Sequence, residues 1–106
     1  MTKGHGLVYY YDNYAVKINT FNQNQLLRKF WNLIGTSTSP YNEEFVAIME
    51  SKEYPIFAVQ FHPEKNLYEW KVTADRSAEG AEIVQIMSNR FIEIARKNKN
   101  RFNSAQ

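Results

Sequence analysis

The clearest hydrophobic pattern along the chain is a pair of short apolar stretches separated by a polar turn. Residues 44–50 alternate so that both faces of a strand would be apolar, and we therefore expect a strand that is covered on both sides. Residues 56–60 form a second apolar stretch, and residues 52–55 between them are polar and include a proline. Two strands joined by such a short turn predict an antiparallel hairpin.

Other short stretches rich in β-branched and aromatic residues predict further extended structure. Residues 7–11 favour a strand, and the Asp-Asn pair that follows them favours a turn. Residues 14–18 predict a second extended stretch, and residues 33–37 are compatible with a third. Residues 37–42 contain serine, threonine, proline and asparagine, so we expect a loop there.

Two segments carry apolar residues at helical spacing. The first spans Leu26 to Trp31, and either Thr20 or Asn22 could cap it. The second is longer and follows Asp75 or Ser77, either of which could be its N-cap. The apolar stripe of this second helix consists of Ile83, Val84, Met87, Phe91 and Ala95.

The predicted order of strands, helix, strands and helix places residues 1–106 in a single domain of the α/β class. A strand that is apolar on both faces needs a covering layer on each side. Two helices and a hairpin supply too little cover for the apolar faces that this pattern predicts. We therefore expect the chain by itself to leave a large apolar surface exposed.

Composition narrows the classes of function. The formal net charge is only +2, which gives no argument for nucleic-acid binding. The sequence has no cysteine, which excludes disulfides and thiolate metal sites within it. No apolar run approaches the roughly 20 residues of a membrane span, and no apolar signal core is visible near Met1. We expect neither a nucleic acid nor a membrane as a partner.

The residues that most clearly suggest chemistry are His62, Pro63 and Glu64, which follow the apolar stretch 56–60. Catalytic and ligand sites of α/β sheets lie beyond the carboxyl ends of strands, and proline stiffens the turn. Residues two positions apart in extended backbone point the same way. We therefore expect Glu64 to accept a hydrogen bond from one ring nitrogen of His62 and to leave the other free to act as a base.

These residues also carry a resemblance to a known family. The segment 61–64 resembles the His-Pro-Glu turn of class I glutamine amidotransferase-like domains. Residues 65–71 narrow the resemblance to γ-glutamyl hydrolases, which typically continue with Pro-Glu-Lys and Tyr-Glu-Trp. Residues 45–50 and 93–98 are similar to the same family, so the likeness covers nearly the whole chain.

The resemblance implies a partial flavodoxin-like α/β domain that contains the C-terminal strands and helices only. It implies hydrolysis of γ-glutamyl bonds in poly-γ-glutamyl folates by a cysteine nucleophile and a histidine base, with no metal and no cofactor. His62 would be the base and Glu64 the carboxylate that orients it. The nucleophile belongs to the N-terminal part of the family, and these 106 residues contain no cysteine. We therefore expect the chain alone to be inactive. Family members are lysosomal, vacuolar or secreted.

Three further residues are candidates for substrate binding. Family members often carry a histidine at the position of Asp12, and an anionic side chain there would repel a polyglutamate. Tyr68 and Trp70 could contact the substrate, although aromatic loop residues more often pack a loop onto the body of a protein, and we favour that interpretation. A metal site is a weak hypothesis, because His5 and His62 have no partner at ligand spacing.

A second hypothesis comes from a different functional class. The chain could be a shortened, non-catalytic relative that serves as a binding module. Its possible partners would then be a second copy of itself or a complementary N-terminal fragment.

Overall fold

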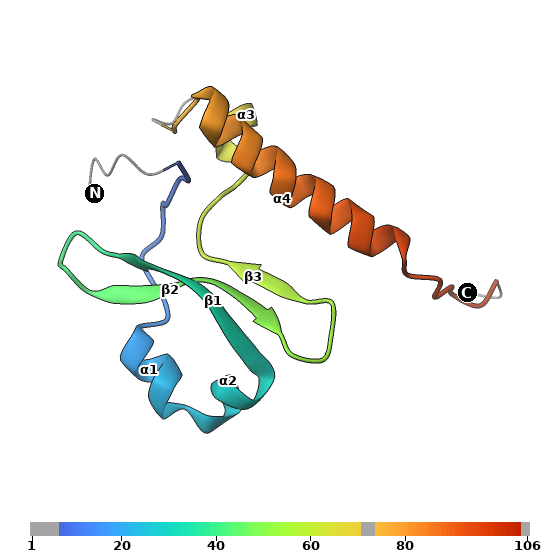
Figure 1. Ribbon diagram of the computed structural model, residues 1–106, viewed down its shortest axis with the longest axis horizontal. Helices are drawn as coiled ribbons and strands as arrows, with labels where there is room; N and C mark the ends of the chain where they lie inside the picture. Colours follow the sequence, from blue (N-terminus) through green and yellow to red (C-terminus); the bar gives the residue numbers. More distant parts are fainter. Residues whose placement is uncertain (1–6, 71–73, 105–106) are drawn as a thin grey trace.

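The computed structural model describes residues 7–70 and 74–104 and confirms the predicted α/β class (Figure 1). A three-stranded sheet has α1 and α2 on one side and α3 and α4 on the other (Figure 1). The elements are α1 (Ile18–Gln23), α2 (Gln25–Phe30), β1 (Trp31–Thr38), β2 (Glu44–Ser51), β3 (Phe57–Val59), α3 (Lys65–Tyr68) and α4 (Ala78–Arg96). No helix within the described ranges is long and apolar enough to cross a membrane.

The sheet has the order β1-β2-β3, and both strand pairs are antiparallel. The predicted hairpin is therefore confirmed, with Ile48 paired to Val59 and Glu50 paired to Phe57. Val46 and Ala47 are neighbours in β2 that point to opposite faces, and both are buried. The centre of β2 is thus covered on both sides, as its pattern predicted.

The segment before α1 runs along the edge of β2 that also carries β3. Lys17 forms an isolated bridge with Phe45, and the N–H of Val46 donates to the carbonyl of Val16 at 2.8 Å. The extended stretch predicted at residues 14–18 is therefore reduced to this one point of pairing, because α1 begins at Ile18. The contact fixes where the N-terminal segment meets the sheet.

The strand predicted at residues 7–11 is wrong. The segment meets the body of the protein at single points, such as the hydrogen bond from the N–H of His62 to the carbonyl of Tyr9. Its aromatic residues serve packing instead. Tyr9 is buried, and the ring of Tyr10 meets the rings of Phe45 and Phe61 edge-on at 5.5 and 5.9 Å between centroids. Aromatic composition here reflects burial rather than strand pairing.

The first predicted helix is split in two at Asn24. The side-chain oxygen of Asn24 accepts hydrogen bonds from the N–H groups of Leu26 and Leu27, which makes it the N-cap of α2. Neither Thr20 nor Asn22 is a cap, because α1 begins earlier and encloses both. An asparagine at this position competes with continued helix and ends α1.

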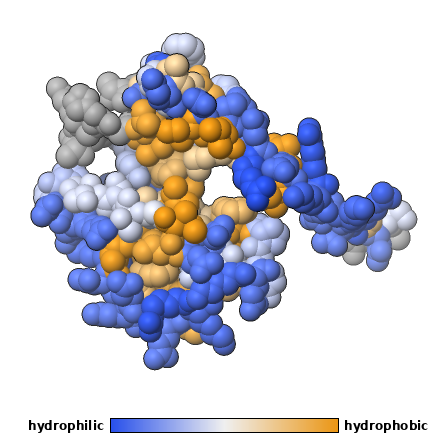
Figure 2. Space-filling model, viewed as in Figure 1, coloured by the Kyte–Doolittle hydropathy of each residue, from blue (hydrophilic) through white to orange (hydrophobic). Residues whose placement is uncertain are grey.

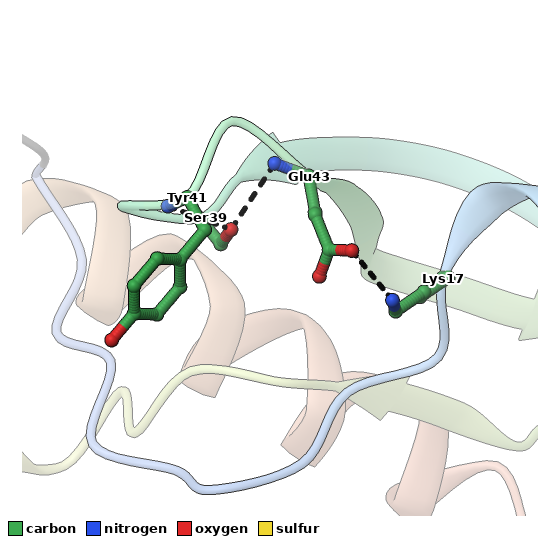
Figure 3. Close-up of polar contacts among 4 residues, drawn as sticks. All are labelled: Lys17, Ser39, Tyr41 and Glu43. Atoms are coloured by element: carbon green, nitrogen blue, oxygen red, sulfur yellow. Dashed lines mark hydrogen bonds and ion pairs between the residues drawn. The ribbon is translucent and has the colours of Figure 1, made fainter.

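The loop between β1 and β2 is organised by Ser39 (Figure 3). Its hydroxyl oxygen accepts hydrogen bonds from the N–H groups of Tyr41 and Glu43, each at 3.2 Å. Asn42 has a φ of 60°, a left-handed conformation that asparagine tolerates better than most residues. Glu43 also pairs with Lys17 at 2.6 Å, so the loop is tied to the segment before α1 (Figure 3).

The long helix α4 begins where the sequence predicted. Ser77 is its N-cap and accepts a hydrogen bond from the N–H of Gly80 at 3.1 Å. Asp75 in turn accepts a hydrogen bond from the N–H of Ser77 at 2.7 Å. The short helix α3 was not expected, because its residues lie in a stretch that predicted a polar loop.

The core is small for a chain of this length. Among residues 7–70 and 74–104, the buried hydrophobic residues are Tyr9, Phe21, Val46, Ala47, Phe61 and Val84. The radius of gyration is 16.3 Å, whereas a compact chain of 100 residues has about 13 Å. The second half of α4 extends beyond the rest of the protein (Figure 1), and Phe91 within it is 65% exposed. Figure 2 shows apolar surface through the middle of the visible face, as the pattern of apolar residues predicted.

Candidate active site

His62 lies three residues beyond β3 and is held through its backbone on both sides. Its N–H donates to the carbonyl of Tyr9 at 2.8 Å, which anchors it to the N-terminal segment. Its own carbonyl accepts a hydrogen bond from the N–H of Lys65 at 3.2 Å, where α3 begins. The backbone of His62 is therefore held between the N-terminal segment and the start of α3.

Glu64 lies beside the Nδ1 atom of His62, at 3.6 Å from its Oε1 atom. This is an ion-pair distance and slightly too long for a hydrogen bond. The side chain of Glu64 is 59% exposed, while that of His62 is 32% exposed. The carboxylate therefore lies beside one ring nitrogen without the predicted hydrogen bond, and Glu64 is in a turn with αR backbone rather than in the extended backbone that the i, i+2 argument assumed.

Asp12 lies beside the other ring nitrogen. Its Oδ1 atom is 3.4 Å from Nε2 of His62, and its side chain is 30% exposed. The Nε2 atom itself has almost no solvent-accessible surface and makes no well-aligned hydrogen bond. The second nitrogen thus has no hydrogen-bond partner among the described residues, but it is enclosed and faces a second carboxylate, which the sequence-based expectation did not include.

The backbone explains how Asp12 reaches this place. The carbonyl of Tyr9 is anchored to His62, and the carbonyl of Val16 is anchored to β2. Asp12 lies between these two anchors, in the part of the segment that passes the imidazole. No local pattern in the sequence indicates this contact, since it joins residues about 50 positions apart.

The interpretation that Tyr68 and Trp70 pack the loop onto the body of the protein is wrong. Their exposed fractions are 74% and 80%, so both project into solvent. The guanidinium of Arg76 lies over the ring of Trp70, at 4.7 Å from the ring centroid. Arg76 also donates to the backbone carbonyls of Asn66 and Glu69. Arg76 was not singled out from the sequence, and it holds the end of α3 in place.

Asn66, the second residue of α3, is the other residue that sequence reasoning missed. It is only 2% exposed, and its side-chain N–H₂ donates to the carbonyls of Leu7 at 3.0 Å and Asp75 at 2.7 Å. It thus joins the N-terminal segment, α3 and the start of α4 beside the His62 turn. A polar residue within a polar stretch gives no sequence signal of such burial.

The part of the chain that the structure describes contains no cluster of side chains that could hold a metal ion. Among those residues, no group of three or more histidine, aspartate or glutamate side chains is arranged to hold a metal ion. Asp12 and Glu64 flank His62 at its two different nitrogens, rather than converging on one point. His5 lies outside the described residues.

Comparison with known proteins defines the class. The family model described as glutamine amidotransferase class-I matches residues 5–75, and the chain belongs to this family. It is 38% identical over 96 residues to gamma-glutamyl hydrolase B of Dictyostelium discoideum, covering 89% of this chain and 28% of that protein. It is 34% identical over 97 residues to gamma-glutamyl hydrolase of Homo sapiens, covering 89% of this chain and 30% of that protein.

A plant relative, probable gamma-glutamyl hydrolase 3 of Arabidopsis thaliana, is 35% identical over 89 residues, which are 83% of this chain and 25% of that protein. The chain thus spans less than a third of the length of these curated relatives. The predicted resemblance to γ-glutamyl hydrolases is confirmed over most of the chain.

Proposed function

We propose that this chain provides the histidine base and the orienting carboxylate of a γ-glutamyl hydrolase that acts on poly-γ-glutamyl folates. The observation that carries the proposal is the placement of Glu64 at 3.6 Å from Nδ1 of His62, just beyond β3. The relatives named as gamma-glutamyl hydrolases support the reaction class.

The chemistry needs a nucleophile from outside these residues, because the sequence contains no cysteine. A thiol brought to His62 would transfer its proton to Nε2 while the sulfur attacks the γ-carbonyl carbon. The imidazolium would then give that proton to the leaving amine, and water would hydrolyse the thioester with His62 again acting as the base. Glu64 would orient the ring through Nδ1 during both steps.

A chimera tests this proposal directly. The matched 96 residues of the Dictyostelium relative would be replaced by this chain, and release of glutamate from a poly-γ-glutamyl folate would be measured. We expect turnover that falls at least about 100-fold on His62→Ala, which is the usual contribution of a general base. His5→Ala is the matched control and should leave turnover unchanged. A folded chimera whose turnover is unaffected by His62→Ala would contradict the proposal.

The chain by itself should show no hydrolysis of the same substrate, because it has no thiol. Turnover by a homogeneous preparation of the chain, abolished by His62→Ala, would require a different nucleophile.

A binding module without catalysis is the second candidate. It is favoured by the position of Asp12 against Nε2 of His62 and by the exposed apolar residues of α4. A chimera that folds and binds the substrate but never turns it over would support this alternative.

A further inference from the structure

We propose that Asp12 is a positioning residue that closes the His62 site by covering Nε2, so that His62 can act as a base only after Asp12 has moved away. This inference rests on the proposed role of His62 as the base. It concerns a contact that the spacing around Pro63 does not contain, since Asp12 comes from the N-terminal segment.

The hydrogen-bonding capacity of imidazole carries the first step. Each ring nitrogen of His62 faces a carboxylate oxygen, at 3.4 Å for Asp12 and 3.6 Å for Glu64. A neutral imidazole has one N–H donor and therefore serves only one of these two carboxylates at a time. A doubly protonated ring serves both, but it has no lone pair left to accept a proton. With Asp12 in place, no arrangement of protons leaves Nε2 as an unobstructed acceptor facing a nucleophile.

Burial carries the second step. The Nε2 atom has almost no accessible surface, although the side chain of His62 as a whole is 32% exposed. A nucleophile or a chemical reagent therefore cannot approach Nε2 while the contact persists. The exposed part of the ring lies elsewhere.

The mobility that this role demands is compatible with the packing around Asp12. Its neighbours Tyr11, Asn13 and Tyr14 are exposed, and Tyr14 is 89% exposed. The anchors of the segment lie at Tyr9 and Val16, three or more residues away on either side. Asp12 can therefore swing outward without uncovering the buried core. The pair is also partly exposed and longer than an ideal hydrogen bond, which makes it weak enough to break.

Carbethoxylation of histidine tests the inference on the whole chain. Diethyl pyrocarbonate transfers its ethoxycarbonyl group to either unprotonated ring nitrogen, so labelling of His62 is counted as its Nε2 adduct, which heteronuclear NMR distinguishes from the Nδ1 adduct and from the adducts of His5. If Asp12 is away from Nε2 for at most about a tenth of the time, Nε2 is accessible only for that fraction, and labelling is slowed at least about tenfold. We therefore expect Asp12→Ala to label His62 about tenfold faster than the wild type at the same pH.

Matched variants separate a positioning role from a structural one. Asp12→Glu should restore slow labelling, and Glu44→Ala, a change of a remote carboxylate, should leave the rate unchanged. Labelling of His5 and the thermal unfolding midpoint should be the same in all variants. Equal His62 labelling rates in the wild type and in a folded Asp12→Ala variant would overturn the inference.

The same substitution in the chimera separates this inference from the proposed function. If both hold, Asp12→Ala raises kcat of the chimera. If labelling responds to Asp12 but no His62-dependent turnover appears, the closed contact is real and the proposed reaction is wrong. If turnover depends on His62 but neither labelling nor kcat changes in Asp12→Ala, the proposed reaction is supported and the positioning role of Asp12 is wrong.

Discussion

Gly80 lies so close to Asp75 that a Cβ atom added to it would sit 2.9 Å from the Oδ1 atom of Asp75 and 3.2 Å from its backbone oxygen. Gly80→Ala in a helix normally stabilises by about 1 kcal/mol. Here the new methyl group would push against a carboxylate that is held by Ser77. We therefore expect a net destabilisation of about 1 kcal/mol, measured by urea unfolding. Gly35→Ala is the control, because its Cβ would be at an ordinary 3.9 Å from Ile48, and it should not destabilise.

The same carboxylate predicts a pH dependence. Hydrogen bonds from the side chain and backbone of Ser77 hold the pKa of Asp75 below its ordinary value of 3.8. A depressed carboxylate pKa contributes stability that is complete above the ordinary value and is lost as the pH falls through the folded-state pKa. Helix content measured between pH 7 and pH 2 should thus fall less steeply at the acid end in Asp75→Asn than in the wild type. Identical profiles would contradict this assignment.

The buried amide of Asn66 predicts a large cost for a small change. Asn66→Asp replaces a group that donates to two carbonyls with a carboxylate that can only accept. We expect a loss of about 2 to 3 kcal/mol in the free energy of unfolding, because both carbonyls lose their donor inside the protein. Asn89→Asp is the matched control, since its exposed oxygen would still accept from Gln85, and it should change stability by less than about 0.5 kcal/mol.

The loop between β1 and β2 offers a test of which polar contact matters more. Ser39→Ala removes the acceptor of two backbone N–H groups and should cost about 1 kcal/mol. Glu43→Gln removes only the ion pair with Lys17, whose side chains are 58% and 53% exposed, and should cost less than about 0.5 kcal/mol. Urea unfolding of both variants would decide, and the reverse order would show that the ion pair holds this loop.

The exposed apolar residues of α4 predict association. Ile86 and Phe91 are 58% and 65% exposed on different sides of the helix, and large apolar side chains exposed to water on this scale favour association or aggregation. Sedimentation should depend on protein concentration in the wild type and much less in an Ile86→Ser/Phe91→Ser variant. A wild-type chain that sediments as a clean monomer at all concentrations, with cooperative unfolding, would show that these residues close their own core.

The elements that could be predicted from the sequence are those whose cause is local. The β2–β3 hairpin follows from alternation and a short turn, and α4 follows from an apolar stripe and the cap at Ser77. The break at Asn24 was not predicted, because it depends on the Asn24 side chain accepting hydrogen bonds as the N-cap of α2 instead of continuing the helix. The burial of Asn66 and the contact of Asp12 with His62 depend on segments far apart in the chain. No local pattern encodes such contacts.

The hydrogen bond between Asn66 and Leu7 spans 59 positions, and this separation has a consequence for the order of folding. The β1–β2–β3 sheet closes only short loops, whereas the His62 turn needs the two distant parts of the chain to meet, and the entropy cost of closing a loop grows with its length. We expect the sheet to form first and the His62 turn to be completed last. In the folded protein the backbone amide of His62 should accordingly exchange its hydrogen before the amides of β2. The arrangement around His62 would then be lost while the sheet is still folded.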